Sequence, residues 1–518
     1  MWGNTRQSRI AFWCIGKKVA MSFLGRDLTD IHCITKDELF HILDNAEIIK
    51  KAIAEKSISQ YQLAKNKDLI AALLFYENST RTRTSFEIAA MRLGMQTTGF
   101  SSTEGTSVKK GESLRHTLDM YEAYNCDAVI MRHPLDGSAR FAADHLGIPV
   151  FNAGDGKHEH PTQTLLDLFT IREHLDRLED FDLGIAGDLK YGRTAHSLAI
   201  ALSKFDNVRL HLFSCADLSL PDDFLQVLNN EGVSVQVHES LAEMAREVDI
   251  LYQTRIQKER MPDLSEFERA KAMSEFTMEM LETTREDFGL MHPLPIDKSA
   301  PSISSSIDGH PKALYKKQAG NGVPTRLVEL ALSLGLIGKD FDGEPWKSPD
   351  ENKDFIEELP VVIKPRRTDV SIRPIRDRGV VIDHVQPFME EVLLRILRVR
   401  ERRDVYRAGT VRSVRRPGSV KGMLMIEERE FTDEDLRAIA TVSPGCRVNT
   451  IREGQVARKI ALKLPSRISG IPSMTCRNKG CITRPEFEES VAPVMVRAGS
   501  DQVRCYYCDQ IMMSATMF

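Results

Sequence analysis

Short apolar runs alternate with helical stretches through much of the first half of this 518-residue chain. The run Leu69–Tyr76 (LIAALLFY) ends in polar residues, as a buried parallel strand does. Further strand-like runs follow at 128–131, 149–152, 183–187, 208–213, 233–238 and 249–254. Because parallel strands need crossover connections, which are usually helices, this alternation predicts an α/β fold with parallel sheets.

The chain is too long for a single core, and its composition changes near Gly338. Residues 339–369 are rich in charge and proline and lack sustained periodicity, so we expect a linker there. A small α+β domain is expected beyond it, from strand-like runs at 380–382, 410–414, 422–426, 446–451 and 455–462 and helical patterns at 385–399 and 432–441. No apolar run approaches the roughly 18 residues of a membrane span, and a net charge of −4 implies no general attraction to nucleic acid or membranes.

Four of the nine cysteines form two close pairs near the end of the sequence, Cys476 with Cys481 and Cys505 with Cys508. Two short loops that each supply two thiolates suit a tetrahedral zinc ion. The alternative of two local disulfides needs an oxidising compartment, which no other feature indicates. A nucleic-acid-binding zinc ribbon is disfavoured, because the flanking basic residues are few and few aromatic residues lie among them. We therefore expect one structural zinc ion and no nucleic-acid partner.

The motif Glu77–Arg83 (ENSTRTR) directly follows the first strand and precedes a helical stretch. A helix amino end presents unpaired backbone N–H groups and the positive end of the helix dipole. Ser79, Thr80 and Thr82 add hydroxyl donors, and Arg81 adds a guanidinium suited to phosphate. The junction therefore predicts an anion site, the alternative being an ordinary capped helix with a solvated basic turn.

Two more motifs follow predicted strands, Met131–Pro134 (MRHP) and His158–Thr164 (HEHPTQT). Ligands bind at the carboxyl ends of parallel strands, where Arg132 and His160 are suited to polarising a single carbonyl oxygen. The HEH triplet lacks the HExxH spacing and a third ligand, which argues against a metal there. Ser107–Glu112 (SVKKGE) lies in a stretch rich in Ser, Thr and Gly, as mobile ligand-covering loops do, although its lysines alone fit solvated surface equally well.

The motifs Gly187–Thr194 (GDLKYGRT) and Thr254–Arg260 (TRIQKER) also stand at strand ends. Their glycine spacing does not match a dinucleotide fingerprint, and no acidic residue closes the strand at 208–213. Two arginines on separate loops suit a dicarboxylate substrate instead. Met291–Pro295 (MHPLP) is a rigid turn whose carbonyl groups can accept hydrogen bonds from an amino group.

In this order, STRTR, the Ser-x-x-Lys-Gly-Glu loop, MRHP, HPTQT, GDLKYGRT, TRIQKER and HPLP resemble the catalytic chain of aspartate carbamoyltransferase over residues 24–336. Residues 370–513, with GVVIDH and the four cysteines, resemble the regulatory chain of the same enzyme. The resemblance implies a natural fusion with two doubly wound parallel-sheet subdomains, an α+β regulatory domain and a four-cysteine zinc module. The resemblance implies an extension without order over 1–20, a carbamoyl phosphate domain over 21–160 and an aspartate domain over 161–320. A helix at 321–337 is expected to pack back on the carbamoyl phosphate domain. A linker over 338–369, a nucleotide-binding-like domain over 370–465 and a zinc domain over 466–518 are expected to follow.

The resemblance also implies the roles of individual residues. The phosphate of carbamoyl phosphate would be held by Ser79, Thr80, Arg81 and Thr82. Its carbonyl oxygen would be polarised by Thr82, Arg132 and His160, and its amide would face Gln163 and the carbonyl groups of Leu294 and Pro295. Aspartate would be bound by Arg193, Arg255 and Gln257, together with Lys110, which with Ser107 would come from a neighbouring subunit.

The implied reaction, a step of pyrimidine biosynthesis, is attack of the aspartate α-amine on the carbamoyl carbon, with release of phosphate and without a catalytic metal. The implied partners are carbamoyl phosphate, L-aspartate and nucleotide effectors, in a cytoplasmic enzyme with a trimeric catalytic core, with a dimer of trimers as the larger option. Asp383, His384, Lys421 and Lys459 match the family's effector positions. Met425 and Ala461 stand where a lysine and an arginine are expected, so the resemblance leaves nucleotide control open.

Three departures and alternatives bear on this interpretation. Ile296 follows HPLP where the family usually has an arginine that shapes the closed state. Ornithine carbamoyltransferase shares STRTR, but its cationic substrate would be repelled by Arg193 and Arg255, and the cysteine it usually carries in the HPLP loop is absent. An inactive scaffold is disfavoured because every side chain expected at the active site is present.

Overall fold

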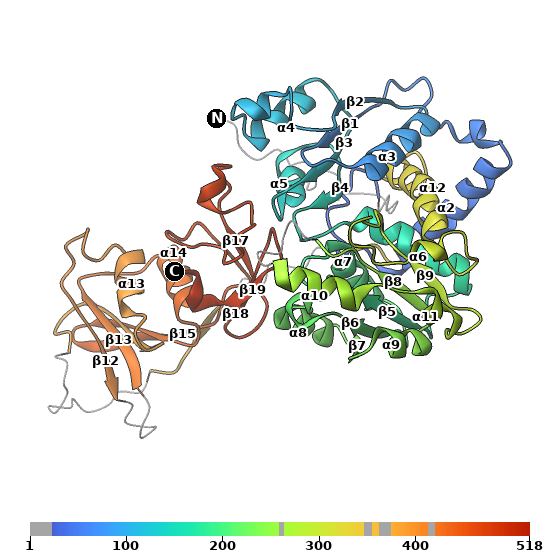
Figure 1. Cartoon of the computed structure of the whole chain (residues 1–518). Helices are drawn as coiled ribbons and strands as arrows, with labels where there is room; N and C mark the ends of the chain where they lie inside the picture. Colours follow the sequence, from blue (N-terminus) through green and yellow to red (C-terminus); the bar gives the residue numbers. More distant parts are fainter. Residues whose placement is uncertain (1–22, 258–263, 347–354, 362–373, 413–419) are drawn as a thin grey trace. The chain divides into compact units, whose positions relative to one another are not determined.

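The computed structural model describes residues 23–257, 264–346, 355–361, 374–412 and 420–518 (Figure 1). The chain divides into two compact units, residues 1–348 and 349–518, each with its own sheets. The expected extension over 1–20 lies outside the described residues. A search of the described residues finds no helix with the length and apolar character of a membrane span.

The first unit begins with helix α2 (Lys36–Ala54), which packs beside a four-stranded parallel sheet. Thr35 and Glu38 form a capping box at its start. The strand order is β2-β1-β3-β4, with β1 (Ile70–Phe75), β2 (Gln96–Phe100), β3 (Ala128–His133) and β4 (Val150–Asp155). The crossovers are α3 (Thr80–Leu93), α4 (Leu114–Ala123) and α5 (Ser138–His145).

Helix α6 (Pro161–Leu175) carries the chain into a second parallel sheet of five strands. Its order is β7-β6-β5-β8-β9, with β5 (Asp182–Ala186), β6 (Arg209–Phe213), β7 (Ser234–Val237), β8 (Ile250–Gln253) and β9 (Gly289–Met291). Its helices are α7 (Arg193–Leu202), α8 (Asp222–Asn230), α9 (Leu241–Glu247), α10 (Leu264–Ser274) and α11 (Met278–Glu282). The two sheets confirm the predicted pair of doubly wound layers.

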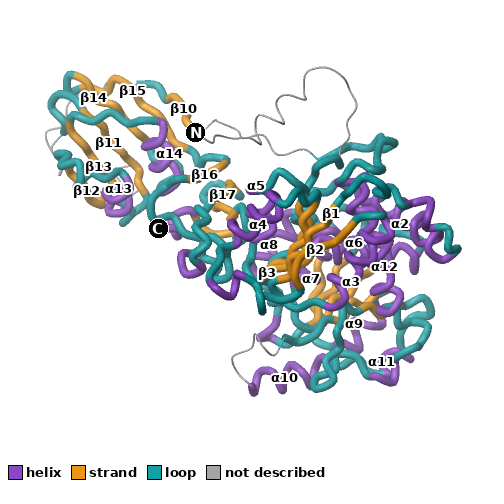
Figure 2. The backbone as a smooth tube through the Cα atoms, turned by 90° about the horizontal axis from the view of Figure 1, so that it is seen from above, coloured by secondary structure: helices purple, strands orange, loops and turns teal. Residues whose placement is uncertain are grey.

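Helix α12 (Tyr315–Ser333) returns from the second sheet to the first and packs against α2, α3 and α6 (Figure 2). Leu327, Val328 and Leu330 of this helix are fully buried in the same apolar core as Phe75 and Phe86. We call the four-stranded sheet with its helices the first lobe and the five-stranded sheet with its helices the second lobe. Helices α6 and α12 both contact the two lobes, so they hold the strand ends of the two sheets at a common cleft.

The second unit contains a six-stranded antiparallel sheet of order β10-β15-β14-β11-β13-β12. Its strands are β10 (Ile356–Glu358), β11 (Gly379–Val385), β12 (Tyr406–Arg412), β13 (Val420–Glu427), β14 (Arg447–Arg452) and β15 (Gln455–Leu462), accompanied by α13 (Glu390–Ile396) and α14 (Asp433–Val442). Strand β10 pairs with β15 and lies within the stretch expected to be a linker.

A separate antiparallel sheet ends the second unit, with β16 (Arg467–Ser469), β17 (Val494–Arg497), β18 (Gln502–Cys505) and β19 (Ile511–Met513) in that order. The predicted zinc ligands Cys476 and Cys481 lie between β16 and β17, Cys505 ends β18, and Cys508 lies in the turn that follows it. An α+β domain followed by a four-cysteine module is thus confirmed.

Candidate active site

A cavity of about 700 Å³ lies where the carboxyl ends of strands from both parallel sheets meet. The sequence-predicted residues that line it are Ser79, Thr80, Arg81, Thr82, Arg132, His160, Gln163, Arg193, Arg255, Gln257, Leu294 and Pro295. They come from six separate segments of the chain, so only the fold brings them together. Parallel sheets place ligand sites at this edge as a rule.

The amino end of α3 forms one wall of the cavity. Ser79 is its N-cap residue, and its hydroxyl makes no capping hydrogen bond within the described residues, while Thr80, Arg81 and Thr82 occupy the first turn. The first-turn N–H groups of a helix have no intrahelical acceptor. Partial burial of its guanidinium lowers the pKa of Arg81. This wall therefore presents hydroxyl groups, first-turn N–H groups and a guanidinium to the cavity.

A second cationic group comes from Arg132 at the end of β3. Its Nε lies 3.4 Å from Glu77 Oε2, and Arg193 Nη1 lies 3.6 Å from the same oxygen. Burial and the nearby Arg193 lower the pKa of Arg132 to about 9. Two buried guanidinium groups that share a single carboxylate leave excess positive charge, which an anionic substrate can balance.

His160 lies beside these arginines as the N-cap residue of α6. Its backbone N–H donates to Ser197 Oγ at 3.0 Å, and its Nδ1 lies 3.3 Å from Thr162 Oγ1. Complete burial, with the charges of Arg193 and Arg132 nearby, holds the pKa of His160 well below its ordinary value. The ring is therefore neutral near pH 7, and when Nδ1 accepts from Thr162 its Nε2–H is a donor for a substrate oxygen.

Arg193 opens α7 and reaches the cavity across the backbone of β4. Its Nη1 donates to the carbonyl oxygen of Gly156 at 2.8 Å. Gly154 has a φ of +112°, and a Cβ there would lie 2.8 Å from Arg193 Cζ, so glycine leaves the space that the guanidinium occupies. Gln257 Nε2 donates to the Tyr191 carbonyl oxygen at 3.1 Å, which fixes it near Arg193.

The turn after β9 also lines the cavity and carries Leu294 and Pro295, which are joined by a cis peptide. His292 organises this turn, because its Nδ1 accepts from the Leu294 N–H at 2.8 Å and its Nε2 lies 2.9 Å from Ser302 Oγ. Burial, with Arg81 and Arg255 nearby, lowers the pKa of His292 to about 3, so this ring is also neutral.

Sequence reasoning did not select Glu77, Gln318 or Arg326 as site residues, although all three line the cavity. Glu77 is the first residue of the ENSTRTR motif, and its place next to the arginines of that motif could have marked it as a site residue. Gln318 and Arg326 lie in α12, far along the sequence from the other residues, and no local pattern marks them.

Ser107 and Lys110 are not among the described residues that line the cavity. They occupy the short 3-10 helix η2 (Ser107–Lys110), and both are exposed. Of the sequence-predicted active-site residues, these two are the ones that the fold of a single chain does not bring to the others.

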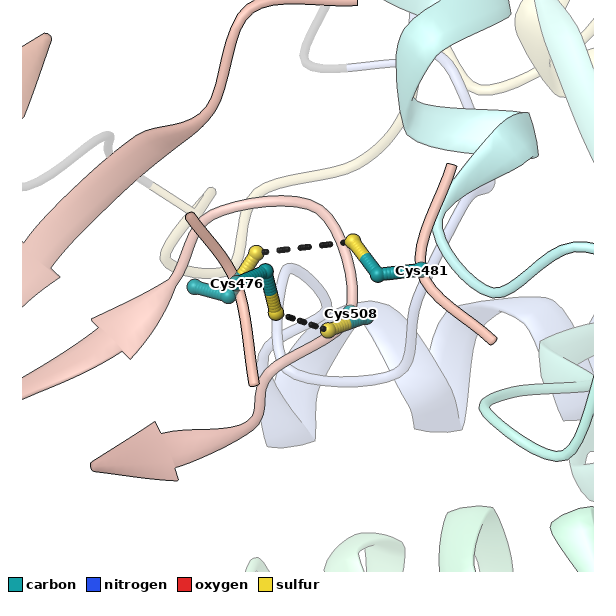
Figure 3. A group of neighbouring side chains, drawn as sticks. Cys476, Cys481 and Cys508 are labelled. Carbon is teal, nitrogen blue, oxygen red and sulfur yellow. Dashed lines mark hydrogen bonds between the residues drawn. The ribbon is translucent and has the colours of Figure 1, made fainter. Parts of the chain in front are cut away.

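The four cysteines Cys476, Cys481, Cys505 and Cys508 form a second site within the other unit. Figure 3 labels three of them, Cys476, Cys481 and Cys508. All four are buried and free of disulfides, and their sulfur atoms lie within 4.8 Å of one another. The Sγ–Sγ distances of 3.5 Å for Cys476–Cys508 and 3.9 Å for Cys481–Cys505 bracket the ~3.8 Å expected for tetrahedral Zn–S bonds of ~2.3 Å. These residues therefore fit zinc.

The effector candidates lie on the six-stranded sheet. Lys421 pairs with Asp383, and Asp383 Oδ2 lies 3.0 Å from His384 Nδ1. Lys459 stands on β15, which β14 separates from β11. Met425 packs in an apolar cluster with Ile375 and Ile451, where a lysine would have to be desolvated.

Four family models match this chain, in succession. Residues 26–173 match the carbamoyl-P binding domain and residues 179–331 the Asp/Orn binding domain of aspartate/ornithine carbamoyltransferases. Residues 370–463 match the allosteric domain and residues 466–517 the metal binding domain of the aspartate carbamoyltransferase regulatory chain.

Individual relatives agree with the family models. The aspartate carbamoyltransferase catalytic subunit of Thermococcus kodakarensis is 44% identical over 61% of this chain and 100% of its own length. The catalytic subunit of M. jannaschii aspartate transcarbamoylase has a TM-score of 0.54 at 40% identity and covers 59% of this chain and 96% of its own. The Trypanosoma cruzi enzyme in complex with N-(phosphonacetyl)-L-aspartic acid has a TM-score of 0.57 at 31% identity and covers 61% of this chain and 97% of its own.

The two parallel-sheet lobes, with an arginine-rich cavity at their common edge, define a carbamoyltransferase. A regulatory region with a structural zinc site follows in the same polypeptide. The chain belongs to the aspartate carbamoyltransferase family, as a fusion of catalytic and regulatory chains.

Proposed function

We propose that the cavity binds carbamoyl phosphate and L-aspartate together and joins them to N-carbamoyl-L-aspartate, with release of phosphate. The observation that carries the proposal is that an anion-binding helix end and separately delivered arginines line a single cavity. Binding two anions side by side costs little when guanidinium groups offset their repulsion, and holding them in contact supplies much of the rate enhancement.

The amino end of α3 is the proposed phosphate site, with Ser79, Thr80, Arg81 and Thr82 as donors. Arg132, His160 and Thr82 are then placed to donate to the carbonyl oxygen, whose negative charge grows as the tetrahedral intermediate forms. Gln163 and the Leu294 and Pro295 carbonyl oxygens face the carbamoyl –NH2. Arg193, Arg255 and Gln257 hold the carboxylates of the aspartate, whose α-amine faces the carbamoyl carbon.

The reaction needs no covalent enzyme intermediate. The α-amine nitrogen forms a bond to the carbamoyl carbon, the carbon–oxygen bond to phosphate breaks, and the amine proton leaves with the phosphate. The zinc ion, when bound by the four cysteines, organises the loops of its own module. The zinc ligands belong to residues 349–518, whereas the proposed catalytic residues belong to residues 1–348.

We further infer that Ser107 and Lys110 complete the cavity of a neighbouring copy, so that the catalytic core is a trimer and a dimer of trimers is its larger assembly. Both residues are exposed on η2, which suits a contribution to another chain. A zinc site made of four cysteines favours a cytoplasmic location, because thiolates that bind zinc persist in reducing compartments.

The regulatory region is the proposed binding site for nucleotide effectors, at the cluster of Asp383, His384 and Lys421, with Lys459 nearby on the same sheet. Met425 and Ala461 supply no charge for a nucleotide's phosphates, so we expect weak effector binding. An aspartate saturation curve, measured with and without ATP, CTP or UTP, tests this. A curve that no nucleotide shifts would contradict an effector site.

The reaction itself is tested by incubating the full chain with carbamoyl phosphate and either L-aspartate or L-ornithine. We expect N-carbamoyl-L-aspartate and phosphate in equal amounts, and no measurable product from ornithine, whose ammonium group the arginines repel. Faster turnover with ornithine would overturn the assignment.

A further inference from the structure

Asp167 lies behind the cavity wall, two turns into α6, and its side chain is fully buried. Gln163 Nε2 and Gln318 Nε2 donate to its Oδ1 at 2.9 and 2.7 Å, and the Tyr252 hydroxyl donates to its Oδ2 at 2.9 Å. Gln163 and Gln318 line the cavity, whereas Asp167 is not among its described lining residues. The carboxylate therefore acts on the cavity through its two glutamine neighbours.

The first consequence concerns the orientation of Gln163. Asp167 Oδ1 accepts hydrogen bonds whether the carboxyl group is ionised or carries its proton on Oδ2, so the amide group that faces Oδ1 must be the –NH2. The amide is planar and carries oxygen and nitrogen on opposite sides, which leaves Gln163 Oε1 for the cavity. Without Asp167 nothing in these contacts would prevent the amide from rotating and presenting a donor instead.

The second consequence concerns the turn after β9. Gln318 donates to Asp167 through Nε2, and its Oε1 accepts from the His292 backbone N–H at 2.9 Å. His292 Nδ1 in turn accepts from the Leu294 N–H at 2.8 Å. A continuous chain of hydrogen bonds thus connects one carboxylate to the turn that carries the Leu294 and Pro295 carbonyl groups.

We propose that Asp167 is a positioning residue that aims three acceptors, Gln163 Oε1 and the Leu294 and Pro295 carbonyl oxygens, at the –NH2 of the carbamoyl group. This inference rests on the proposed function. It makes Asp167 a determinant of selectivity, because an acyl phosphate without an amino group leaves the acceptors unpaired. Sites built to hydrogen-bond a substrate N–H reject analogues that lack it by large factors.

Acetyl phosphate is the probe that separates this role from a merely structural one, since it replaces the –NH2 by a methyl group and keeps the phosphate and carbonyl. In Asp167→Leu we expect kcat/KM for carbamoyl phosphate to fall roughly 10- to 100-fold, as for loss of hydrogen bonds to buried polar groups. The inhibition constant of acetyl phosphate against carbamoyl phosphate should stay within about 3-fold of wild type, because the phosphate donors are untouched. Equal losses for both ligands would overturn the proposal.

Two conservative variants sharpen the test. Asp167→Asn keeps an Oδ1 for both glutamines and places an –NH2 near the Tyr252 oxygen, so we expect it to retain the selectivity. Tyr252→Phe removes a hydrogen bond to the same carboxylate without touching either glutamine, and should retain it too. A loss of selectivity in Asp167→Asn as large as in Asp167→Leu would contradict the proposal.

If circular dichroism shows that Asp167→Leu does not fold, Gln318→Leu decides the question. It leaves the contact between Asp167 and Gln163 intact and breaks the link to His292, so carbamoyl phosphate should again lose more than acetyl phosphate. Unchanged selectivity would overturn the proposal. Wild-type enzyme that forms no carbamoyl aspartate would instead contradict the proposed function, so the two failures are distinguishable.

Discussion

Arg193, at the start of α7 in the second lobe, lies 3.6 Å from the carboxylate of Glu77, which follows β1 in the first lobe. Glu77 also lies 3.4 Å from Arg132. The carboxylate therefore links the lobes and holds both arginines beside the place where the substrates are proposed to meet. Breaking this link should loosen aspartate binding while the phosphate wall on α3 is preserved.

We predict that Glu77→Gln raises KM for aspartate about 10-fold or more, since hydrogen bonds to charged groups contribute more than neutral ones. Inhibition by inorganic phosphate should change little. Glu87→Gln is the matched control, because Glu87 pairs with Arg83 on the same helix and is not among the described cavity residues. Steady-state kinetics of both variants measure the effect, and equal KM values for them would contradict the assigned role of Glu77.

Arg132→Ala tests stabilisation of the oxyanion. Losing a donor to the developing negative charge should lower kcat on the order of 100-fold or more. Arg209→Ala is the control, because Arg209 pairs with Asp182 at the far end of the second sheet and is two-thirds exposed. Near-normal turnover in a folded Arg132→Ala protein would remove Arg132 from the mechanism.

A pH effect on stability follows from Asp167. Burial raises its pKa to about 7, well above the ~3.9 of an unfolded chain. A raised carboxyl pKa means that the folded state binds the proton more tightly, so the stability contributed by this group is present below pH ~4 and is lost as pH rises toward 7. Asp167→Asn should therefore gain thermal stability relative to wild type between pH 5 and 8. Melting temperatures of the two proteins at pH 5 and at pH 8 measure this gain. The same difference in melting temperature at both pH values would contradict the prediction.

Zinc removal should act on the regulatory unit. Structural zinc sites contribute folding free energy directly, so Cys481→Ser should lower the zinc content and make residues 466–518 sensitive to protease. Cys446→Ser is the control, because Cys446 is a single buried thiol of the adjacent sheet. Metal analysis should give one zinc per wild-type chain, and full zinc retention in Cys481→Ser would contradict the ligand assignment.

Sharing of active sites between subunits predicts complementation. Lys110→Ala and Arg132→Ala should each be strongly impaired alone. In mixed trimers a site that takes Arg132 from one chain and Lys110 from its neighbour is intact, so co-expression should restore up to about a quarter of wild-type activity. Activity no higher than that of either variant alone would show that Lys110 serves no neighbouring site.

Much of the fold could be predicted because buried parallel strands form apolar runs of recognisable length. The run at Leu69–Tyr76 contains β1, and the runs at 208–213 and 249–254 contain β6 and β8. Strand β2 escaped notice because it is a sheet edge of polar, partly exposed residues, and β9 because it has only three residues. Strand β10 lies in a stretch that the sequence predicts to be a linker, since its Ile-Glu-Glu sequence carries no alternation.

The site was predictable where its chemistry is local to a motif. Arg81 follows β1 in the first turn of α3 and Arg132 stands at the end of β3, positions that the apolar runs before them mark in the sequence. Asp167 and Gln318 carry no such mark, because Asp167 lies inside an apolar helix and its partner lies 151 positions further along the chain. Their importance depends on helix packing, which periodicity does not reveal.

The central claim is that one cavity holds two anionic substrates at once. N-(phosphonacetyl)-L-aspartate carries a phosphonate and two carboxylates in a single molecule, so its binding measured by isothermal titration calorimetry tests the claim most directly. We predict one ligand per chain, with affinity weakened at least about 10-fold by Arg132→Ala and likewise by Arg255→Ala. Binding that neither substitution weakens, or no binding to the wild-type chain, would contradict the account.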